Sequence, residues 1–457
     1  MRDFAGSARS AADAARRKEL RRVLLSSCIG SAIEYYDFLL YVAAASLIFG
    51  RLFFSNLTPV MATIASLGTL AVGYVSRPLG AVFFGHFGDR YGRKSVLIAT
   101  LITMGVSTTL IGLLPTSAQI GIWSPAALVF LRMLQGVSVG GEWGGGALMA
   151  FEHAPEHRRG FASSCSVAGG PAGTMLAAGV LGLFALLPQS QFLAWGWRVP
   201  FLLSAVLVGV GFWMRIRVAE SPLFVEAQRK RQATGATHRP PLFDVLRAPK
   251  PLLVGFISML APFTLYSLVA SFGLTYARKH GLPISSVLAI QATGAVFCAF
   301  SEVLCGYLSD RFSRHSVLIF GITAGALLAY PFLLLLASGD VFKTTAGFLL
   351  MNVCVIGPVL GPSAAYLAEQ FDTHSRYTGA SLGLQTASTV GAGFAPITLA
   401  SLLALNGGGY QLILAFIVTI CLLSGAVIGI RANTRRRRQV HALSTIIATP
   451  ANGDHRN

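Results

Sequence analysis

The stretch that decides the fold is Gly85–Lys94, which reads GHFGDRYGRK and joins two long apolar runs. A related decapeptide, Gly306–His315, reads GYLSDRFSRH and occupies the same kind of junction in the second half of the chain. Both begin with glycine and carry Asp-Arg at the fifth and sixth positions. In the second copy Ser313 and His315 replace the last glycine and the lysine, so its match is the weaker one.

A second pair of matches points to an internal duplication. Glu152 ends one apolar run and is followed by Arg159 seven residues later, and Glu369 ends another and is followed by Arg376 at the same spacing. Both pairs of matches are offset by about 220 residues, which indicates a duplicated unit of the kind found in transporters.

Twelve apolar runs surround these junctions, and a membrane-spanning helix needs about 20 such residues. They lie at 22–50, 58–84, 95–114, 124–150, 160–187, 197–215, 250–277, 286–308, 316–338, 342–368, 378–405 and 409–431. We therefore predict an all-α membrane protein with twelve transmembrane helices in two six-helix repeats. The expected divisions are an N-terminal tail 1–21, a bundle 22–215, a central loop 216–249, a second bundle 250–431 and a C-terminal tail 432–457.

The composition excludes a soluble protein. Charged residues make up 12% of the 457 residues and hydrophobic residues 54%, whereas a soluble domain carries about 25% charged residues. A net charge of +18 is typical of nucleic-acid binding only where a soluble basic face exists, so no nucleic-acid partner is expected. Instead, 29 of the 36 Lys and Arg residues fall on the side of the two tails and the central loop. Because such residues concentrate in cytoplasmic segments, we expect a multi-pass protein of the cell membrane with both termini in the cytoplasm.

At these residues the chain resembles the major facilitator superfamily, whose loop G-x-x-x-D-[RK]-x-G-[RK]-[RK] is matched in full by Gly85–Lys94. More narrowly, it resembles the metabolite:proton symporter family, which includes carriers for shikimate, 2-oxoglutarate, citrate and proline/betaine. The stretches that carry this narrower resemblance are Ile33–Phe38, Arg77–Gly80, Arg132–Gly136, Gly140–Trp143, Trp197–Phe201, Glu220–Pro222 and Arg376–Gly379. The resemblance covers about 22–431 and implies alternating access, with the substrate site between two halves.

The resemblance also implies a cytoplasmic gate. In the superfamily the loop clamps the halves together while the carrier is open to the outside, through a carboxylate that pairs with basic residues and a helix dipole of the other half. The corresponding residues of this chain are Gly85, Asp89, Arg90, Gly92, Arg93, Glu152, Arg159, Asp310, Arg311, Glu369 and Arg376. The alternative is that these charges only mark the cytoplasmic side.

Ionisable residues inside apolar runs are costly to place and therefore point to function. Glu34 and Asp37 lie three residues apart in the first run, and Arg132 lies at a similar depth in the fourth. We predict a proton switch, with Asp37 slightly favoured as its carboxylate. Ionised, the carboxylate pairs with Arg132; protonated, it releases Arg132 to an anionic substrate, because burial favours the neutral acid and a nearby arginine the charged one. The alternative is a static ion pair between the first and fourth helices.

Substrate contacts are expected from Arg132 and three other residues. Tyr41 lies on the same helix face as Asp37, and Gln135 follows Arg132 by three residues. Arg77 either binds a substrate carboxylate in a bidentate fork or extends to the membrane interface.

These residues predict a secondary active symporter, not an enzyme, that imports a small organic acid such as shikimate or a di- or tricarboxylate. The expected partners are this anion, protons and the lipid bilayer, and the resemblance implies a monomer. The sequence contains no phosphate-binding loop and no metal-ligand cluster, so no cofactor is expected. The alternatives are a carrier of a zwitterion such as proline or betaine, an exporter, and, from another class, a channel or a transporter-like sensor.

Overall fold

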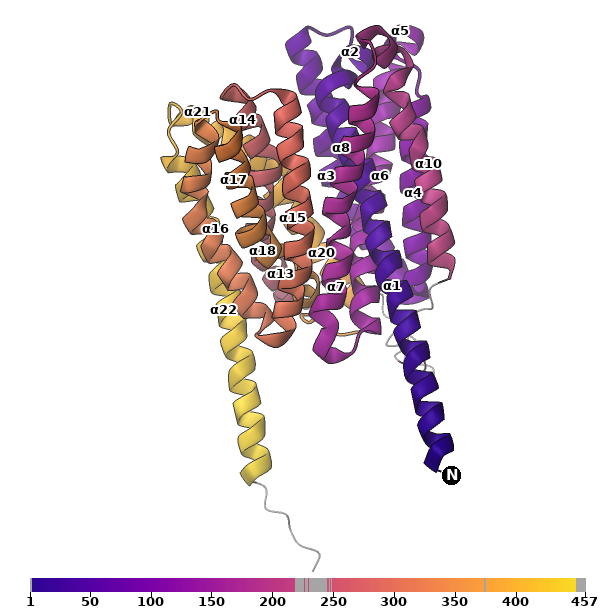
Figure 1. Cartoon of the computed structure of the whole chain (residues 1–457), viewed down its shortest axis with the longest axis vertical. Coiled ribbons are helices and arrows are strands. Elements are labelled where there is room, and N and C mark those ends of the chain that lie inside the picture. The colour runs from indigo at the N-terminus through magenta and orange to yellow at the C-terminus, as the bar shows by residue number, and fades with distance from the viewer. Residues whose placement is uncertain are drawn as a thin grey trace, which may run out of the picture.

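The computed structural model describes residues 2–217, 226, 229, 245, 247, 249–373 and 375–448 (Figure 1). Within these ranges, the side chains at 2–17, 46, 47, 59, 60, 63, 64, 67, 89, 93, 143–145, 284, 285 and 435–448 are not described. The predicted central loop 216–249 and the end of the predicted tail 432–457 therefore fall largely outside the described residues. The described residues form helices joined by short connections.

The described part of the N-terminal half contains six long helical runs. They are α1 (Arg2–Ala44) continued by η1 (Ala45–Phe49) and α2 (Gly50–Phe53), α3 (Pro59–Tyr91), α4 (Arg93–Leu113), α6 (Trp123–His153), α7 (Arg159–Val167) with α8 (Gly169–Phe184), and α10 (Arg198–Ile216). Short helices lie in the connections, namely α5 (Ser117–Ile120), η2 (Glu156–Arg158), α9 (Gln189–Gln191) and η3 (Phe192–Gly196).

The C-terminal half contains six more. They are α13 (Pro249–Ser267) with η4 (Leu268–Gly273) and α14 (Leu274–Lys279), α15 (Ile284–Arg311), α16 (Arg314–Ala337), α17 (Val341–Met351) with η5 (Asn352–Ile356), α18 (Gly357–Leu360) and α19 (Ser363–Ala368), α20 (Arg376–Ser388) with η6 (Thr389–Phe394) and α21 (Ala395–Leu405), and α22 (Gln411–Ala448). The predicted all-α fold is confirmed.

The lengths and surfaces of these runs suit a bilayer. Among the described residues, ten helical runs are long and apolar enough to cross a membrane. The other two, α3 and α6, have 33 and 31 residues and lie alongside them (Figure 1); at about 1.5 Å per residue each exceeds a core of about 30 Å. Large apolar side chains such as Phe300 and Leu422 are exposed, as expected where lipid rather than water covers the surface.

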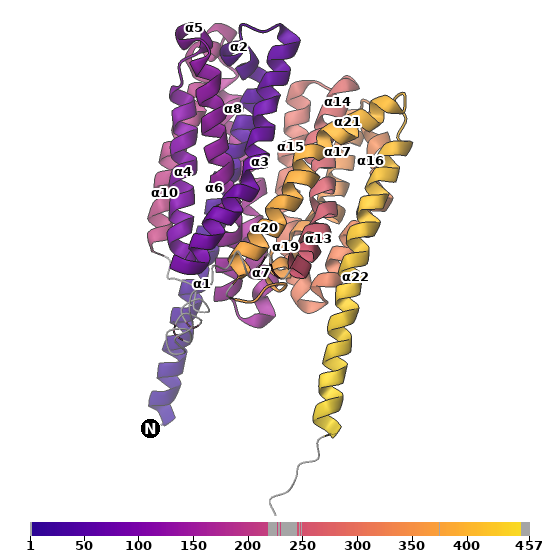
Figure 2. The same cartoon turned by 180° about the vertical axis from the view of Figure 1, so that it is seen from behind.

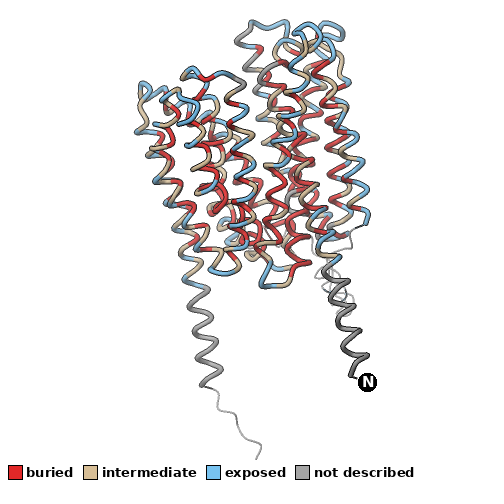
Figure 3. Tube along the Cα trace, in the orientation of Figure 1, coloured by how far each residue is buried: buried red, intermediate tan, exposed pale blue. Residues whose placement is uncertain are grey.

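The two halves stand side by side, and α1 and α22 extend beyond the bundle at the same end (Figures 1 and 2). We call this end the terminal side. Buried residues fill the interior of each half and gather where the halves meet near the terminal side (Figure 3). A cluster there joins Phe84 and Phe151 of the N-terminal half to Ala365, Ala368 and Tyr377 of the C-terminal half. The junction that frames the site is therefore packed at this end.

Small residues bring α3 and α6 close together. A Cβ at Gly80 would lie 2.8 Å from the Cα of Val137, and a Cβ at Gly140 would lie 2.7 Å from the amide nitrogen of Ala81. Because only glycine allows backbones to approach this closely, the two helices that carry Arg77 and Arg132 are held at a short separation.

Candidate functional site

A cavity lies between the two halves, lined by residues of α1, α3, α13, α20 and η6. The lining residues are Glu34, Tyr35, Phe38, Tyr74, Arg77, Phe263, Tyr266, Ser388 and Ala392. The volume that the centre of a water molecule can occupy is about 30 Å³, which is room for about two waters. The cavity is thus narrower than an organic acid in this conformation, although it combines charged, polar and aromatic groups.

Arg77 provides the positive charge of the cavity. Its guanidinium stacks on the rings of Phe38 and Tyr74, with Cζ 4.5 Å and 4.2 Å from the ring centroids. Its Nη1 donates to the Ser388 hydroxyl across the junction at 3.3 Å, and its buried Nε has no hydrogen-bond partner. An arginine with an unused donor in a cavity is suited to an anion. The interface alternative for Arg77 does not describe this conformation, since the side chain lies in the cavity.

Glu34 brings a carboxyl group to the same cavity. The residue is 4% exposed, and its Oε2 is buried without a hydrogen-bond partner. A buried carboxylate without a partner is costly, so such a group binds a proton or meets a ligand. Tyr74, Phe263, Tyr266 and Ser388 complete the lining. None of these four is among the site residues expected from the sequence, although Tyr74 lies one helical turn before Arg77 and therefore shares its face.

Asp37 points into the N-terminal half instead of lining the cavity. It is 0% exposed, and its Oδ1 accepts a hydrogen bond from the Ser204 hydroxyl of α10 at 2.7 Å. The other carboxylate oxygen, Oδ2, is buried without a hydrogen-bond partner. Three residues advance about 300° around a helix, so the directions of Glu34 and Asp37 differ by about 60°. That difference is enough for Glu34 to line the cavity while Asp37 points into the interior of the N-terminal half.

Arg132 lies behind the cavity wall. It is 1% exposed, and its guanidinium stacks on Phe38 and Tyr41, with Cζ 4.7 Å and 4.2 Å from the centroids. Its Nη1 donates to Gln135 Oε1 at 3.2 Å, and Nε and Nη2 have no acceptor. In the described part of the chain no ion pair joins Arg132 to Asp37 or Glu34. The direct pair that the sequence suggested is therefore absent in this conformation: Arg132 donates to Gln135, and Asp37 accepts from Ser204.

Two other expected substrate contacts are also buried away from the cavity. Tyr41 is 0% exposed and donates its hydroxyl hydrogen to Thr69 at 2.7 Å. Gln135 is 0% exposed and donates from Nε2 to Thr108 Oγ1 at 2.7 Å. Both lie around Arg132, so of the four expected substrate contacts Arg77 alone lines the cavity.

A buried ion pair in the N-terminal half was missed from the sequence. The Glu142 carboxylate of α6 pairs with Arg215 of α10, which also donates to the carbonyl of Leu97 in α4. Both side chains are at most 5% exposed. In the sequence Arg215 is one basic residue among several at the end of an apolar run. Nothing in the sequence distinguishes it from the basic residues that only mark the cytoplasmic side.

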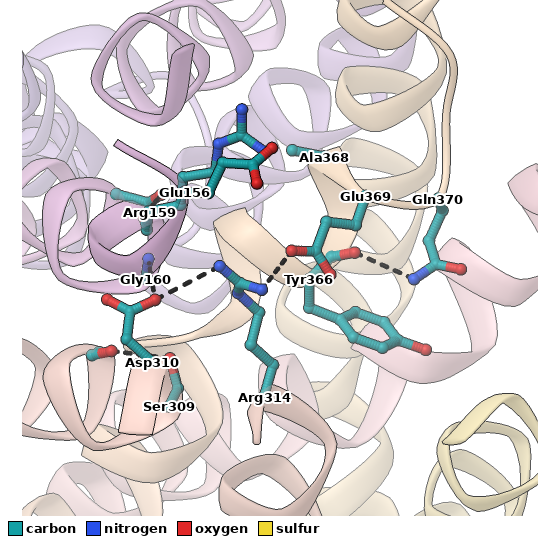
Figure 4. Close-up of polar contacts among 12 residues, drawn as sticks. Glu156, Arg159, Gly160, Ser309, Asp310, Arg314, Tyr366, Ala368, Glu369 and Gln370 are labelled. Carbon is teal, nitrogen blue, oxygen red and sulfur yellow. Dashed lines mark hydrogen bonds and ion pairs between the residues drawn. The ribbon is translucent and has the colours of Figure 1, made fainter. Parts of the chain in front are cut away.

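The terminal side carries contacts that join the halves (Figure 4). The Asp310 carboxylate of α15 accepts hydrogen bonds from the backbone amides of Gly160 and Phe161, each at 2.8 Å. These amides open α7, so an acid of one half caps a helix of the other, where the helix dipole favours negative charge. Arg314 pairs with Asp310 at 3.4 Å and also with Glu369.

A second contact between the halves is an ion pair between Arg376 and Glu152 at 3.1 Å. Arg376 also donates to the carbonyl of Ala368 at 3.0 Å, which orients it. Arg159 pairs with Glu156 at 3.4 Å. Of the repeated glutamates, Glu152 thus pairs with Arg376 across the junction, and Glu369 pairs with Arg314.

The residues of the two decapeptide loops differ in how far they are packed or exposed. Gly85 packs on Thr378 of α20, and Gly92 ends α3 with φ of 103°, a conformation that favours glycine. Arg90 and Arg311 are exposed and lie over Tyr91 and Tyr307. The side chains of Asp89 and Arg93 lie outside the described residues.

Comparison with known proteins identifies relatives for almost the whole chain. The model of the Major Facilitator Superfamily matches residues 27–396. The shikimate transporter of Escherichia coli K12 is 38% identical over 406 residues, which cover 88% of this chain and 92% of that protein. The proline/betaine transporter of Salmonella typhimurium is 32% identical over 450 residues, 95% of this chain and 87% of that protein. The solved structure of the proton:xylose symporter XylE bound to 6-bromo-6-deoxy-D-glucose superposes with a TM-score of 0.73 at 14% identity, covering 91% of this chain and 95% of that one.

Proposed function

Since the chain belongs to the major facilitator superfamily and is therefore a multi-pass membrane transporter rather than an enzyme, we propose that it is a proton-coupled symporter that takes up a small organic acid across the cell membrane. The observation that carries the proposal is that both Arg77 and Glu34 line one cavity between the halves. A guanidinium binds a carboxylate through two parallel hydrogen bonds. A buried carboxyl group changes its charge by taking up a proton. The site therefore holds the groups that an anion and a proton need.

The positive-inside bias assigns the terminal side to the cytoplasm, with both termini there. The contacts of Asp310 with α7 and of Arg376 with Glu152 then close the cytoplasmic side. Substrate enters from the outside when the halves part there, and it leaves after these contacts break. The narrowness of the cavity supports this order, because an organic acid fits only after such a movement. Alternating access by rocking of two halves about a central site is the transport mode that follows.

Asp37 and Glu34 carry the coupling protons in this scheme, with Asp37 the main one. Asp37 is fully buried and keeps one carboxylate oxygen without a partner, so a proton has a place to bind. Glu34 also touches the ligand, because it lines the cavity. Arg132, with Tyr41 and Gln135 around it, adds positive charge behind the Phe38 ring, on which Arg77 also stacks.

The favoured substrate is a hydroxylated carboxylic acid of the shikimate type. Its carboxylate would bind Arg77, and its hydroxyl groups would bind the hydroxyls of Tyr74, Tyr266 and Ser388, which share the cavity. The relative named as a shikimate transporter supports this class.

A second candidate is a zwitterion such as proline or betaine. Tyr35, Phe38, Tyr74, Phe263 and Tyr266 surround the cavity, and aromatic faces bind quaternary ammonium groups. Ionised Glu34 would add a negative charge for the ammonium, while Arg77 would hold the carboxylate. The relative named as a proline/betaine transporter supports this alternative.

Uptake in proteoliposomes tests both candidates. Purified protein is reconstituted, an inward proton gradient is imposed, and uptake of labelled shikimate is measured with unlabelled di- and tricarboxylates, proline or betaine as competitors. We expect gradient-driven accumulation that a protonophore abolishes and that organic acids inhibit. Uptake indifferent to the gradient would reject proton coupling. Inhibition by betaine and proline alone would select the zwitterion carrier.

A further inference from the structure

One face of α20, a helix at the junction of the halves, carries polar side chains from the cavity toward the terminal side (Figure 2). Ser388 of this face lines the cavity together with Ala392 of η6. Gln385 and Ser381 lie three and seven residues before Ser388, so they share its face, one and two turns nearer the terminal side. Both are buried, Gln385 with 2% and Ser381 with 0% of its surface exposed. The polar face therefore continues from the cavity into the closed junction.

The neighbouring face of the same helix is apolar. Ala380, Leu384 and Ala387 each come one residue before a position of the polar face, and all three belong to the core of the C-terminal half. A helix that only packed the two halves together would be more stable with apolar residues on both faces, because a buried polar atom without a partner costs free energy. The polar face is thus suited to a conformation in which it meets water or substrate.

Two polar atoms of this face have no hydrogen-bond partner while the terminal side is closed. Gln385 donates from Nε2 to the carbonyl of Val139 in α6 at 3.1 Å, across the junction, and its Oε1 has no partner. A carbonyl only accepts, so the amide nitrogen faces Val139 and the amide oxygen is an unused acceptor. The Ser381 hydroxyl is also buried without a partner. Because nearly all buried polar atoms are hydrogen-bonded, these two exceptions require a reason.

We propose that Ser381 and Gln385 form a second substrate subsite, which binds the organic acid after the halves part on the terminal side. The inference rests on the proposed symport and adds the step between the cavity and the cytoplasm. When the halves part, the bond to Val139 breaks, and the Gln385 amide offers one acceptor and two donors to a ligand. The Ser381 hydroxyl adds a donor and an acceptor one turn further along the helix. The subsite therefore fits a molecule that carries several hydroxyl groups.

Tyr377 closes the terminal end of the polar face. It lies four residues before Ser381, is 0% exposed and donates its hydroxyl hydrogen to the carbonyl of Gly141 in α6. Its ring packs on α3 at Gly88, where a Cβ would lie 3.1 Å from the ring. In this conformation Tyr377 therefore separates the subsite from the terminal side, and opening at this end requires the bond to Gly141 to break.

The chemistry of the subsite predicts its selectivity. A hydroxylated acid has several O–H donors for Gln385 Oε1, whereas betaine has none, since its nitrogen is fully methylated. A site built to hydrogen-bond a ligand rejects an analogue that lacks the matching group, because the polar atom of the site is then left unpaired. Gln385 should therefore favour the hydroxylated acid over betaine on the terminal side.

The test measures binding from each side of the membrane separately. Right-side-out and inside-out vesicles that contain the protein are preloaded with unlabelled shikimate, and the exchange of labelled shikimate gives KM on the exposed side. Gln385→Leu removes the amide, and Ser381→Ala removes the hydroxyl. For both we expect KM on the terminal side to rise about threefold to tenfold, the effect of losing one or two uncharged hydrogen bonds, and KM on the opposite side to stay unchanged.

Two controls accompany these variants. Thr386→Val is matched to them, because the Thr386 hydroxyl bonds the carbonyl of Leu382 in its own helix, and it should leave KM unchanged on both sides. Cyclohexenecarboxylate, which is shikimate without its hydroxyl groups, serves as an inhibitor. Its inhibition from the terminal side should be the same in Gln385→Leu as in the unmodified protein, since it has no hydroxyl hydrogen for the amide oxygen.

The sign of the change separates this role from a structural one. If Gln385 only held the halves together through Val139, Gln385→Leu would favour opening on the terminal side and lower KM there. Ser381→Ala breaks no hydrogen bond of this conformation, so it decides alone if Gln385→Leu does not fold. An unchanged or lower terminal-side KM in either folded variant would overturn the subsite. If the unmodified protein exchanged no organic acid, the proposed function itself would fail, so the two failures are distinguishable.

Discussion

Arg376 of α20 forms an ion pair at 3.1 Å with Glu152 of α6, across the junction of the two halves. The Glu152 side chain is 0% exposed in this pair and that of Arg376 13%. Removal of one partner takes a cross-junction ion pair away from a buried charge, which destabilises the arrangement that buries it. The terminal-side closed conformation therefore depends on this pair.

Breaking the pair should open the terminal side. In Glu152→Gln or Arg376→Ala, we expect cysteines introduced near Tyr377 to react faster with a water-soluble thiol reagent than in the unmodified background. The charge-exchanged double variant Glu152→Arg/Arg376→Glu should recover part of the protection. Equal reactivity in all variants would show that the pair does not hold this conformation.

Gly85 should be as important for closure of the terminal side as the ion pair of Glu152 and Arg376. A Cβ there would lie 2.9 Å from the Cα of Thr378, so Gly85→Ala pushes α3 and α20 apart. We expect slower uptake and a more accessible terminal side. Gly68→Ala in the same helix is the control, since a Cβ at that position has nothing within 4 Å. Comparable uptake by the two variants would contradict the steric argument.

Arg77 should determine affinity for the substrate. Hydrogen bonds to a charged group contribute about 1.5–3 kcal/mol, so Arg77→Ala should raise KM by roughly tenfold to a hundredfold. Arg77→Lys keeps the charge but not the planar fork, so its KM should lie between those of the unmodified protein and Arg77→Ala. Arg278→Ala, an exposed arginine at the end of α14, serves as the control. Unchanged KM in Arg77→Ala would move the carboxylate site elsewhere.

Asp37 should be required for coupling rather than for binding. Asp37→Asn mimics the protonated acid, so we expect counterflow exchange to persist while proton-driven accumulation is lost. Glu34→Gln is the paired measurement. If Asp37→Asn accumulates substrate normally and Glu34→Gln fails, the coupling proton belongs to Glu34. Arg132→Ala should lose transport in both assays.

The buried pair of Glu142 and Arg215 should contribute to stability. Glu142→Gln leaves Arg215 buried without its counter-charge, and loss of one partner of such a pair costs about 3–5 kcal/mol. We expect a lower unfolding temperature in detergent. The partly exposed pair of Glu19 and Arg22, 3.8 Å apart, gives the control, and Glu19→Gln should change stability by about 1 kcal/mol at most. A joint replacement, Glu142→Leu/Arg215→Met, should restore stability, because no lone charge remains.

The sequence predicted the fold because its signals are local. The apolar runs, the bias of Lys and Arg toward one side, and the decapeptide 85–94 with its second copy are all present in short stretches. Span length and insertion orientation depend on these stretches alone. The same locality explains why Glu34, Asp37, Arg77 and Arg132 stood out, since ionisable residues inside apolar runs are rare wherever the helices finally pack.

The partners of these residues depended on tertiary structure. Periodicity places Glu34 and Asp37 near one face, but the packing of α10 against α1 decides that Asp37 meets Ser204 while Glu34 lines the cavity. Likewise, equal spacing relates Glu152 to Arg159 and Glu369 to Arg376, yet Glu152 pairs with Arg376 across the junction. The linear chain was thus enough to predict twelve helices, both termini on one side of the bilayer, and the family. Which charges meet depends on the fold, because residues far apart in the sequence set the rotation of each helix and the distance between helices.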